Sequence, residues 1–384
     1  MNILKKIFFA SLFIFFISLL FWGIYTISFK KAFFNDSADN KILSSDPNLN
    51  INTKSPEVVN AKIAPVSEEP VISPVLSLDE NNILYYSTSG ELKETDLIGS
   101  TTKKISDKKI TSLLSATWSP DKSKALLKTN AKGYEYFLLF DAQSQKITTL
   151  NNNINATTWL GTSDKIIYKY FDPAKRKSSL NISDPNGENW KKIADLPHDK
   201  ISFFQVPRSG LVSFWNNGDA YYPTALQSIS LLGENLKSLY QSGFGADYLW
   251  DSIGSHALVS QTDAKGGTKM QLGIINYNGG EYKNLGLPTF VSKCAWSKDN
   301  KTIYCALPGN IPDNAILPND YKTEKFKTSD TFWKINTETG EKERIVKTDD
   351  IAEAYDVSRP FLNSDESLLF FVNKNNGKLY KISL

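Results

Sequence analysis

A ten-residue segment, Trp118–Leu127, recurs along this chain and limits the folds open to it more than any other feature. Its sequence is Trp-Ser-Pro-Asp-Lys-Ser-Lys-Ala-Leu-Leu, an aromatic residue, a Ser-Pro-Asp turn and a short apolar run. Proline fixes the backbone angle φ in a turn, and aspartate accepts a hydrogen bond from the backbone two residues on, so the pattern predicts a β-hairpin. Further copies, some of them weaker, begin at Leu76, Trp159, Val206, Trp250, Trp296 and Leu362.

The copies follow one another at a nearly constant spacing. Their last apolar residues are Tyr85, Leu127, Tyr168, Phe214, Val259, Cys305 and Phe371. The first six of these lie 41 to 46 residues apart, and the last interval is 66 residues. Each copy is followed by a third strand-like stretch that ends in Asp, Asn or Ser, then by a turn and a fourth stretch. Four strands repeated about every 40 to 45 residues are typical of β-propeller blades. The alternative is that the shared residues only reflect the composition that turns have in any β-protein.

The repeat resembles that of the TolB-like (PD40, WD40-like) β-propellers. The resemblance rests on the Ser-Pro-Asp turn, the apolar run after it and the strand ending in Asp before a Gly turn, best seen in Trp118–Leu127 and Trp296–Cys305. It covers about residues 71 to 384, although the glycine that usually follows the aspartate in this family is absent. The resemblance implies an all-β, seven-bladed propeller that acts through contacts with other proteins.

The last repeat contains only three strand-like stretches, so the ring is expected to take its fourth strand from the other end of the propeller. The β-prone segment before the first repeat is Glu57–Ile63, with neighbours up to Val66. Pairing the two ends removes open sheet edges, which otherwise bind other strands. We therefore expect a propeller over residues 57–384, with 57–66 as the closing strand and the blades beginning at about residue 71.

The first 56 residues predict a membrane anchor and a tether. Residues 7–29 carry no charge, are long enough to cross a hydrocarbon core as a helix and lack a convincing signal-peptide cleavage site. We expect a single-pass protein of the cell membrane with residues 1–6 in the cytoplasm and the propeller outside it; an inward-facing sensor domain is the alternative. Residues 30–56 are rich in Asn, Ser and Asp, which predicts a flexible tether.

The two cysteines, Cys294 and Cys305, flank the turn at residues 296–301. Counting outward from this turn places them opposite or nearly opposite one another on paired strands, within reach of a disulfide. The bond requires export of the domain to an oxidising compartment, and two buried thiols are the alternative.

The composition disfavours several classes of function. With 44 basic and 41 acidic residues and no basic stripe, we expect no nucleic-acid binding. Two His and two Cys leave little material for a metal site, and we expect no cofactor. His198 and His256 are expected to be structural, and the segment 184–188 lacks the ligand pattern of a calcium loop. The sequence motifs of serine hydrolases, zinc proteases and phosphate-binding loops are absent.

The longest irregular segment, residues 308–331, joins the second and third strands of the sixth blade. In a propeller such loops share a face with the connections between blades, here residues 346–360. We expect the two segments to form a rim over blades six and seven that binds an unknown protein or polymer. The predicted rim residues are Tyr321, Asp320, Tyr355, Arg359 and Asp350. An insertion that merely covers a blade is the alternative.

The sequence therefore predicts a monomeric, non-catalytic binding module that contacts the membrane through residues 7–29. The alternative is a propeller-class enzyme acting on glycans or peptides. A glycan-cleaving propeller would need two or more carboxylates at matched depth on the innermost strands. The stretches predicted to form innermost strands carry almost none: Val75–Leu78, Ser115–Trp118, Asn155–Trp159 and Lys293–Trp296.

Overall fold

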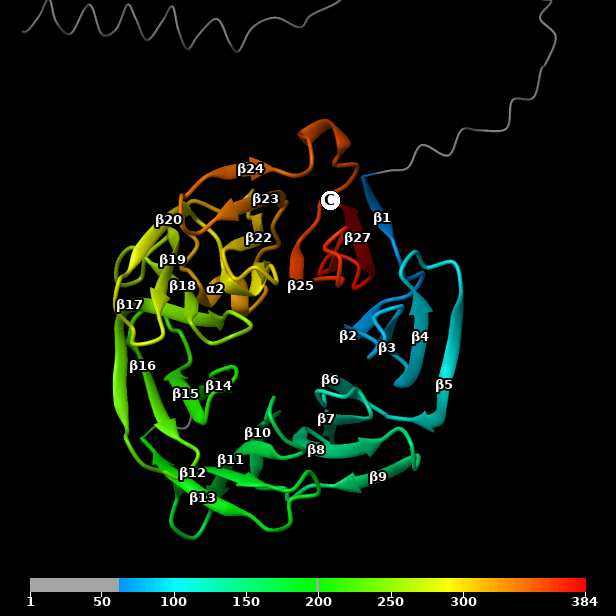
Figure 1. Cartoon of the computed structure of the whole chain (residues 1–384), viewed down its shortest axis with the longest axis vertical. Helices are drawn as coiled ribbons and strands as arrows, with labels where there is room; N and C mark the ends of the chain where they lie inside the picture. Colours follow the sequence, from blue (N-terminus) through cyan, green and yellow to red (C-terminus); the bar gives the residue numbers. More distant parts are fainter. Residues whose placement is uncertain (1–61, 198–199) are drawn as a thin grey trace, which may run out of the picture. The chain divides into compact units, whose positions relative to one another are not determined.

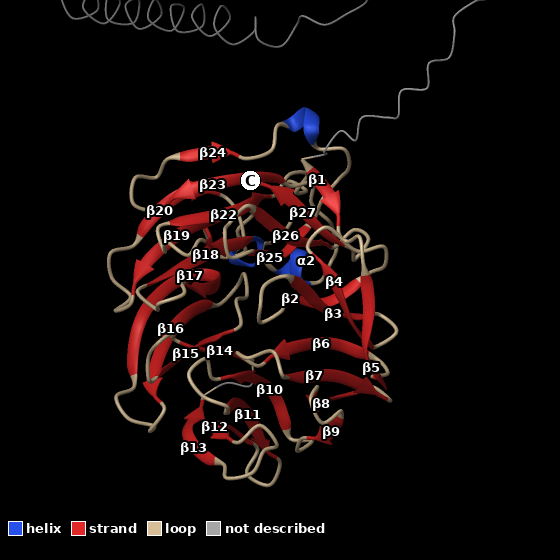
Figure 2. Cartoon of the chain, turned by 45° about the vertical axis from the view of Figure 1, so that its right-hand side comes forward, coloured by secondary structure: helices blue, strands red, loops and turns tan. Residues whose placement is uncertain are grey.

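The computed structural model describes residues 62–197 and 200–384, most of which lie in antiparallel β-strands and the turns between them. The strands form sheets that stand around an open centre, as the blades of a propeller do (Figure 1). The described helical segments are short: α2 (Asn319–Lys322) and the 3₁₀ turns η2 (Val291–Lys293) and η3 (Thr348–Asp350) (Figure 2). The predicted all-β propeller fold is confirmed.

Among the described residues, five sheets have four strands and one sheet has seven. The first sheet contains β2 (Val71–Leu76), β3 (Asn82–Ser87), β4 (Glu91–Asp96) and β5 (Thr102–Lys109). The second contains β6 (Leu113–Trp118), β7 (Lys124–Ala131), β8 (Tyr134–Asp141) and β9 (Lys146–Thr149). The third contains β10 (Ile154–Trp159), β11 (Ile166–Asp172), β12 (Lys177–Ser183) and β13 (Lys191–Leu196).

One strand, β17, joins two repeats into a single seven-stranded sheet. The sheet contains β14 (Ile201–Gln205), β15 (Leu211–Asn216), β16 (Pro223–Ser230), β17 (Lys237–Trp250), β18 (His256–Thr262), β19 (Met270–Asn276) and β20 (Lys283–Leu287). The first part of β17 pairs with β16, and its last part pairs with β18. It is therefore the outermost strand of one half of the sheet and the innermost strand of the other half.

The last sheet is completed by a strand from the other end of the propeller. The two remaining sheets contain β21 (Cys294–Trp296), β22 (Thr302–Leu307), β23 (Thr331–Asn336) and β24 (Lys342–Arg344), and then β25 (Val357–Leu362), β26 (Leu368–Asn373), β27 (Leu379–Ser383) and β1 (Ile63–Pro65). Ile63 of β1 lies opposite Ile382 of β27. The closing strand thus falls within the predicted segment 57–66, of which residues 57–61 lie outside the described residues.

The recurring turn is held by side-chain hydrogen bonds, as its residue types predict. The hydroxyl of Ser119 donates to Asp121 (2.6 Å), which also accepts from the backbone N–H of Ser123 (3.1 Å). Hydrogen bonds from Ser119 and Ser123 lower the pKa of Asp121 to about 2. The carboxylate therefore stays charged at neutral pH and continues to accept these bonds.

The tryptophan of the motif joins neighbouring sheets. The indole N–H of Trp118, at the end of β6, donates to the carbonyl of Ser73 on β2 (2.9 Å). Corresponding bonds link Trp159 to the carbonyl of Thr117 and Trp296 to the carbonyl of Leu249. Since each bond crosses from one innermost strand to the preceding one, the repeated tryptophan explains why successive repeats stack side by side.

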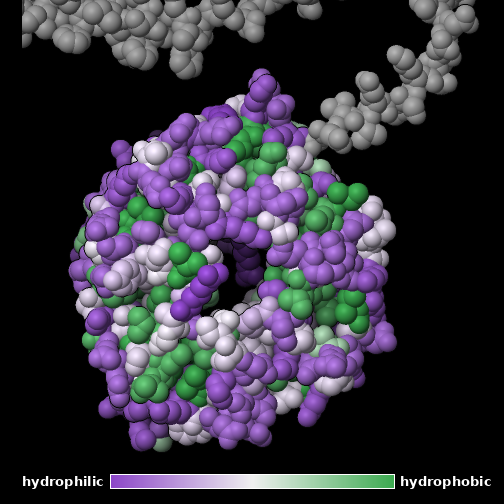
Figure 3. Space-filling model, viewed as in Figure 1, coloured by the Kyte–Doolittle hydropathy of each residue, from purple (hydrophilic) through white to green (hydrophobic). Residues whose placement is uncertain are grey.

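Apolar side chains fill the spaces between sheets. Ile83 of β3 shares one cluster with Phe370 of β26, and Leu258 of β18 shares another with Ile303 of β22. All four side chains are fully buried. The core is thus distributed around the ring, and hydrophilic, intermediate and hydrophobic residues all border the central opening (Figure 3).

The predicted anchor, residues 7–29, and the predicted tether, residues 30–56, lie outside the described residues. Within the described part of the chain, no helix is long and apolar enough to cross a membrane. The domain limits drawn at residues 6, 29 and 56 stay predictions.

Cys294 on β21 and Cys305 on β22 lie directly opposite one another and form a disulfide, as the spacing predicts. The bond closes a short loop, because the two residues are 11 positions apart. A cross-link of this kind acts mainly by restricting the unfolded chain.

We expect replacement of both cysteines by alanine to lower the free energy of unfolding by about 3 kcal/mol, the restriction expected for a loop of this size. Denaturant unfolding of the full chain measures the loss, and wild-type protein treated with a reducing agent should show the same loss. The protein is isolated from its native cell envelope and denatured without reduction. Two reactive thiols in this material would contradict the bond.

Candidate active site in the central channel

A cavity of about 400 Å³ lies on the inner side of the ring, against β17, β25 and the segment between β22 and β23. One carboxylate, Asp247, and three cationic side chains line it. The cations are Lys322, Arg359 and Lys374. A larger hollow of about 1100 Å³ shares Asp247 and Lys322 with this cavity and extends over β14, β15 and the start of β16. The two hollows together form the candidate site.

The segment 308–330, between β22 and β23, brings Lys322 into the cavity. Its helix α2 reaches across to the seven-stranded sheet, where the side chain of Asn319 accepts a hydrogen bond from the backbone N–H of Ala220 (2.9 Å). The ammonium group of Lys322 donates to the carbonyl of Gly218 (2.8 Å). The segment therefore turns inward and lines the cavity. It also meets the connection 346–360, where the backbone N–H of Asp330 donates to the carbonyl of Tyr355 (2.8 Å), while a partner-binding rim stays a prediction.

The same segment has a small core of its own. Ala315, Leu317 and Tyr321 are buried against Met270 and Phe290. The rings of Tyr321 and Phe290 stack with their centres 4.6 Å apart. This packing fixes α2, and with it the backbone that carries Lys322.

Gly245 allows α2 to approach β17. Its φ of +66° favours glycine, and a Cβ atom at this position would lie 2.4 Å from Cδ of Pro318, at the start of α2. The pairing of β17 with β18 shifts register between Phe244 and Asp247, which marks a bulge beside the glycine. The bulge and the close contact together set Asp247 and Lys322 around one cavity.

We expect Gly245→Ala to displace α2, to reduce any activity of the site and to destabilise the fold more than Gly340→Ala does. Gly340 has a comparable φ of +80° but open space around its Cα, so its variant carries only the left-handed strain of about 1–2 kcal/mol. Denaturant unfolding of both variants isolates the contact with Pro318. Equal losses of stability would show that the contact is not required.

The pKa values of Asp247 and Lys322 are shifted toward one another. Burial raises the pKa of Asp247 above its ordinary value of 3.8, although Lys322 and hydrogen bonds from Tyr248 and Trp215 oppose the shift. Burial lowers the pKa of Lys322 below 10.5, although Asp247 and Asp219 oppose it. Asp247 is half-buried and Lys322 is exposed, so solvent screening weakens the shift at Lys322 more than the shift at Asp247.

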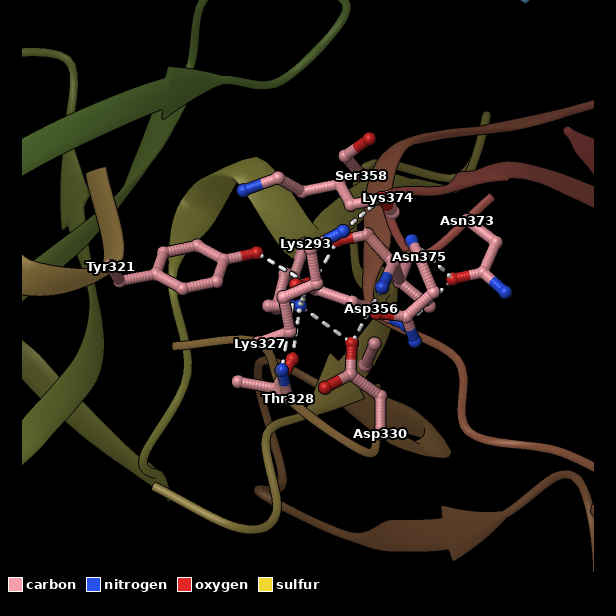
Figure 4. A network of polar contacts seen from close by, with 12 residues as sticks. Lys293, Tyr321, Lys327, Thr328, Asp330, Asp356, Ser358, Asn373, Lys374 and Asn375 are labelled. Atoms are coloured by element: carbon pink, nitrogen blue, oxygen red, sulfur yellow. Dashed lines mark hydrogen bonds and ion pairs between the residues drawn. The ribbon is translucent and has the colours of Figure 1, made fainter. Parts of the chain in front are cut away.

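A buried ionic network supports this wall of the site (Figure 4). The fully buried ammonium group of Lys293 contacts the carboxylates of Asp330 (2.6 Å) and Asp356 (2.7 Å), which are also fully buried. It further donates to the hydroxyl of Thr328 and to the carbonyl of Val357, each at 3.0 Å. One lysine thus compensates two carboxylates in a region without water access.

Tyr321 connects the network to α2. Its hydroxyl donates to Asp356 (2.6 Å), and the ammonium group of Lys374 lies 4.3 Å from the centre of its ring. Burial alone would raise the pKa of Asp356, but Lys293 and Tyr321 lower it overall. At Asp330 burial dominates and raises the pKa, and Oδ1 of Asp330 has no hydrogen-bond partner among the described residues. The network therefore fixes the residue next to Lys322.

The structure separates the predicted rim residues. Tyr321 and Tyr355 are buried, with 6% and 3% of their surface exposed, so neither offers contact area to a partner. Arg359 lines the central cavity, whereas Asp320 pairs with Lys325 (2.6 Å) outside it. Asp350 is exposed on η3. Of the five predicted rim residues, only Tyr321 and Arg359 line the same cavity. Binding of a partner stays a prediction.

Sequence reasoning missed Asp247, Lys322 and Lys374. For Asp247 a signal existed, because a carboxylate within the apolar stretch Ala246–Trp250 is costly to bury. For the two lysines there was none, because their positions depend on how the segment 308–330 packs.

Metal ligation finds no support in the described residues. Over 62–197 and 200–384, no three His, Cys, Asp or Glu side chains are placed to hold a metal ion together. His256 lies beside Asp251 (3.5 Å), and Asp184 pairs with Lys165 (2.7 Å) in the turn that the sequence predicts.

Comparisons with known proteins identify the fold. No model of a known family matches the chain, and no curated protein matches its sequence. A solved oligogalacturonate lyase in complex with manganese is similar, with 12% identity and a TM-score of 0.61 over 84% of this chain and 93% of that one. An oligogalacturonate lyase from Vibrio parahaemolyticus shows 11% identity and a TM-score of 0.60 over the same shares. The β-propeller domain of the Trilobed protease from Pyrococcus furiosus shows 12% identity and a TM-score of 0.54, over 82% and 95%.

These similarities show a β-propeller. The fold behind the resemblance to TolB-like repeats is thereby confirmed, while membership of that narrower family stays a prediction. The prediction of a non-catalytic binding module is contradicted, because the oligogalacturonate lyases are enzymes of this fold and fit the alternative better. The sequence argument considered only paired carboxylates, whereas the cavity described above places one carboxylate among cations.

Proposed function

We propose that this protein is an enzyme that cleaves an acidic polysaccharide by β-elimination in the central cavity. The lining of that cavity carries the proposal, because one carboxylate and three cationic side chains surround about 400 Å³ of space. A positive cavity favours an anionic substrate. The structural similarity to oligogalacturonate lyases, enzymes named for an acidic sugar chain, supports the same class.

Asp247 and Lys322 have the properties of a base and an acid for this reaction. A base removes the proton from the sugar carbon beside the carboxylate, the electron pair forms a carbon–carbon double bond, and the glycosidic oxygen leaves and takes up a proton. Asp247 is the base, since a raised pKa strengthens it. The ammonium group of Lys322 is the acid, since a lowered pKa makes it a better proton donor.

Arg359 and Lys374 complete the site. Both line the cavity, and a guanidinium group matches the two oxygens of a carboxylate. They bind the carboxylate of the sugar and stabilise the negative charge that develops on it as the proton leaves.

The pH dependence of the activity follows from the two shifts. Asp247 must be ionised, so kcat/KM falls as the pH drops through its pKa, which lies above 3.8. Lys322 must be protonated, so kcat/KM falls as the pH rises through its pKa, which lies below 10.5. We expect a bell-shaped profile, and Lys322→Arg should move its alkaline limb upward. A profile whose limbs are unchanged in this variant would exclude Lys322 as the acid.

The first test uses the full chain and a panel of polysaccharides. Polygalacturonate, alginate and hyaluronan supply uronate units, and starch is the neutral control. The conjugated double bond of an elimination product absorbs ultraviolet light, so we expect absorbance to rise with at least one acidic polymer and not with starch. Absence of any rise, or cleavage of starch alone, would contradict the proposal.

We also propose a seven-bladed ring built from TolB-like repeats, counting β17 as the outermost strand of the fourth blade and the innermost strand of the fifth. The pairing of β17 on both sides supports this count.

We propose further that residues 7–29 anchor the enzyme in the cell membrane, with the propeller outside the cytoplasm. The disulfide supports this orientation, because such bonds persist in oxidising compartments. Protease treatment of intact cells or spheroplasts should then remove the propeller, and full protection of it would contradict the orientation.

A further inference from the structure

Trp190 differs from every other tryptophan that the structure describes. The indole N–H groups of the other six donate hydrogen bonds within the protein: Trp118, Trp159, Trp215, Trp250, Trp296 and Trp333. Trp190, in the turn between β12 and β13, is 64% exposed and has no hydrogen bond or ring contact with the described residues. Its indole ring offers a flat apolar face with a polar N–H at its edge, which suits contact with a partly polar ligand.

A second cavity, of about 520 Å³, begins at Trp190 and lies on the sheet β10–β13, away from the central site. Its polar lining is partly built into the fold, because Asn181 is only 2% exposed. The amide nitrogen of Asn181 donates to the carbonyl and the hydroxyl of Ser179, at 3.2 and 3.0 Å. Tyr170 of β11 adds aromatic surface. Aromatic rings beside fixed amide and hydroxyl groups suit a ring-shaped polar ligand.

The charges of this cavity favour one negative group on the ligand. Lys175 pairs with Asp172 (3.5 Å), and Lys192 pairs with Asp195 (3.0 Å). Lys177 also lines the cavity and has no ion pair with a described residue. The lining therefore carries one positive charge beyond the paired ones.

We infer that this cavity is a second carbohydrate-binding site, which holds one uronate unit of an acidic polysaccharide. The indole face of Trp190 packs against the C–H face of the sugar ring, the amides and hydroxyls bind its hydroxyl groups, and Lys177 binds its carboxylate. The identity of the polymer rests on the proposed function. Because this site lies on another sheet than Asp247 and shares no lining residue with the cavity of Asp247 and Lys322, it retains a long chain on the enzyme and leaves short substrates unaffected.

Calorimetric titration with an oligogalacturonate tests the inference. The full-chain variant Asp247→Asn is used, so that the ligand is not cleaved, and two binding events are expected. Adding Trp190→Ala or Lys177→Met should weaken one event by about tenfold or more and leave the other unchanged. Tyr134→Ala, at an aromatic residue that is 79% exposed on β8, is the matched control and should change neither event.

Activity separates the two proposals. In the otherwise wild-type chain, Trp190→Ala should lower activity on the long polymer and not on short oligomers. If the wild type cleaves no acidic polymer but Trp190→Ala still abolishes a binding event, the proposed function fails and the second site stands. Binding that neither Trp190→Ala nor Lys177→Met alters, or no binding outside the central cavity, would overturn the inference.

Discussion

Replacing Lys293 with methionine is expected to lower the free energy of unfolding by about 3–5 kcal/mol. The methionine side chain fits the space but carries no charge, so Asp330 and Asp356 lose the ammonium group that contacts both of them. Two carboxylates would remain in a site without exposed surface, and the cost of burying an uncompensated charge is large. Denaturant unfolding of the full chain measures the change.

The control for this prediction is Lys301→Met. Lys301 also pairs with an acid, Glu338 (3.0 Å), but both side chains are more than half exposed, at 58% and 59%. Surface pairs contribute about 0–1 kcal/mol, so this variant should unfold almost like the wild type. Similar losses of unfolding free energy in both variants would show that the buried network contributes no more to stability than a surface ion pair.

Acidification should reduce the deficit of Lys293→Met. Without the ammonium group, burial and mutual repulsion hold the pKa values of Asp330 and Asp356 above those of the unfolded chain. A carboxyl group with a raised pKa in the folded state stabilises the fold at low pH and loses that contribution as the pH rises through the raised value. A deficit that grows on acidification would contradict this account of the network.

Asp247→Asn and Lys322→Met are expected to lower kcat by about 100-fold or more, the contribution typical of a positioned acid or base. Asparagine preserves the shape of Asp247 and its capacity to accept from Trp215 Nε1 (3.0 Å), but it cannot take up the proton. Methionine removes the proton that Lys322 delivers. Initial rates on the acidic polymer cleaved by the wild type measure both effects.

Lys325→Met is the matched control for Lys322→Met. Lys325 follows α2 closely in the same segment, but its ammonium group pairs with Asp320 (2.6 Å) outside the cavity. The control should keep wild-type kcat, and all three variants should unfold near the wild-type midpoint. Full activity in Asp247→Asn or Lys322→Met would remove that residue from the proposed mechanism.

The fold was predictable because its determinants are local and repeated. Ser119 and Asp121 form the turn by hydrogen bonds between near neighbours, and the pattern recurs along the chain. The spacing of Cys294 and Cys305 around such a turn was enough to place them within reach of a disulfide, and the structure shows the bond where two buried thiols were the alternative. The closing strand followed from counting strands, and Ile63 indeed pairs with Ile382.

The site was not predictable in the same way, because it depends on contacts between distant segments. The sequence predicted that the segments 308–331 and 346–360 meet, and Tyr321 does bond Asp356, 35 positions further on. It did not show that Tyr321 would be buried. The path of α2 also depends on the close contact of Pro318 with Gly245, which no local sequence pattern predicts. Aromatic and charged residue types in a loop are compatible with a partner surface and with a channel wall, and only packing distinguishes the two.

The chemistry of the cleaved bond is tested most directly by cleavage in water enriched in heavy oxygen, followed by mass measurement of the fragments. β-Elimination uses no water, so we predict fragments without the label, one of which ends in an unsaturated sugar and is lighter by one water than the hydrolysis product. Hydrolysis would introduce the heavy oxygen at the new end and leave no double bond. Labelled, saturated fragments would contradict the assignment of Asp247 and Lys322 as the base and acid of an elimination.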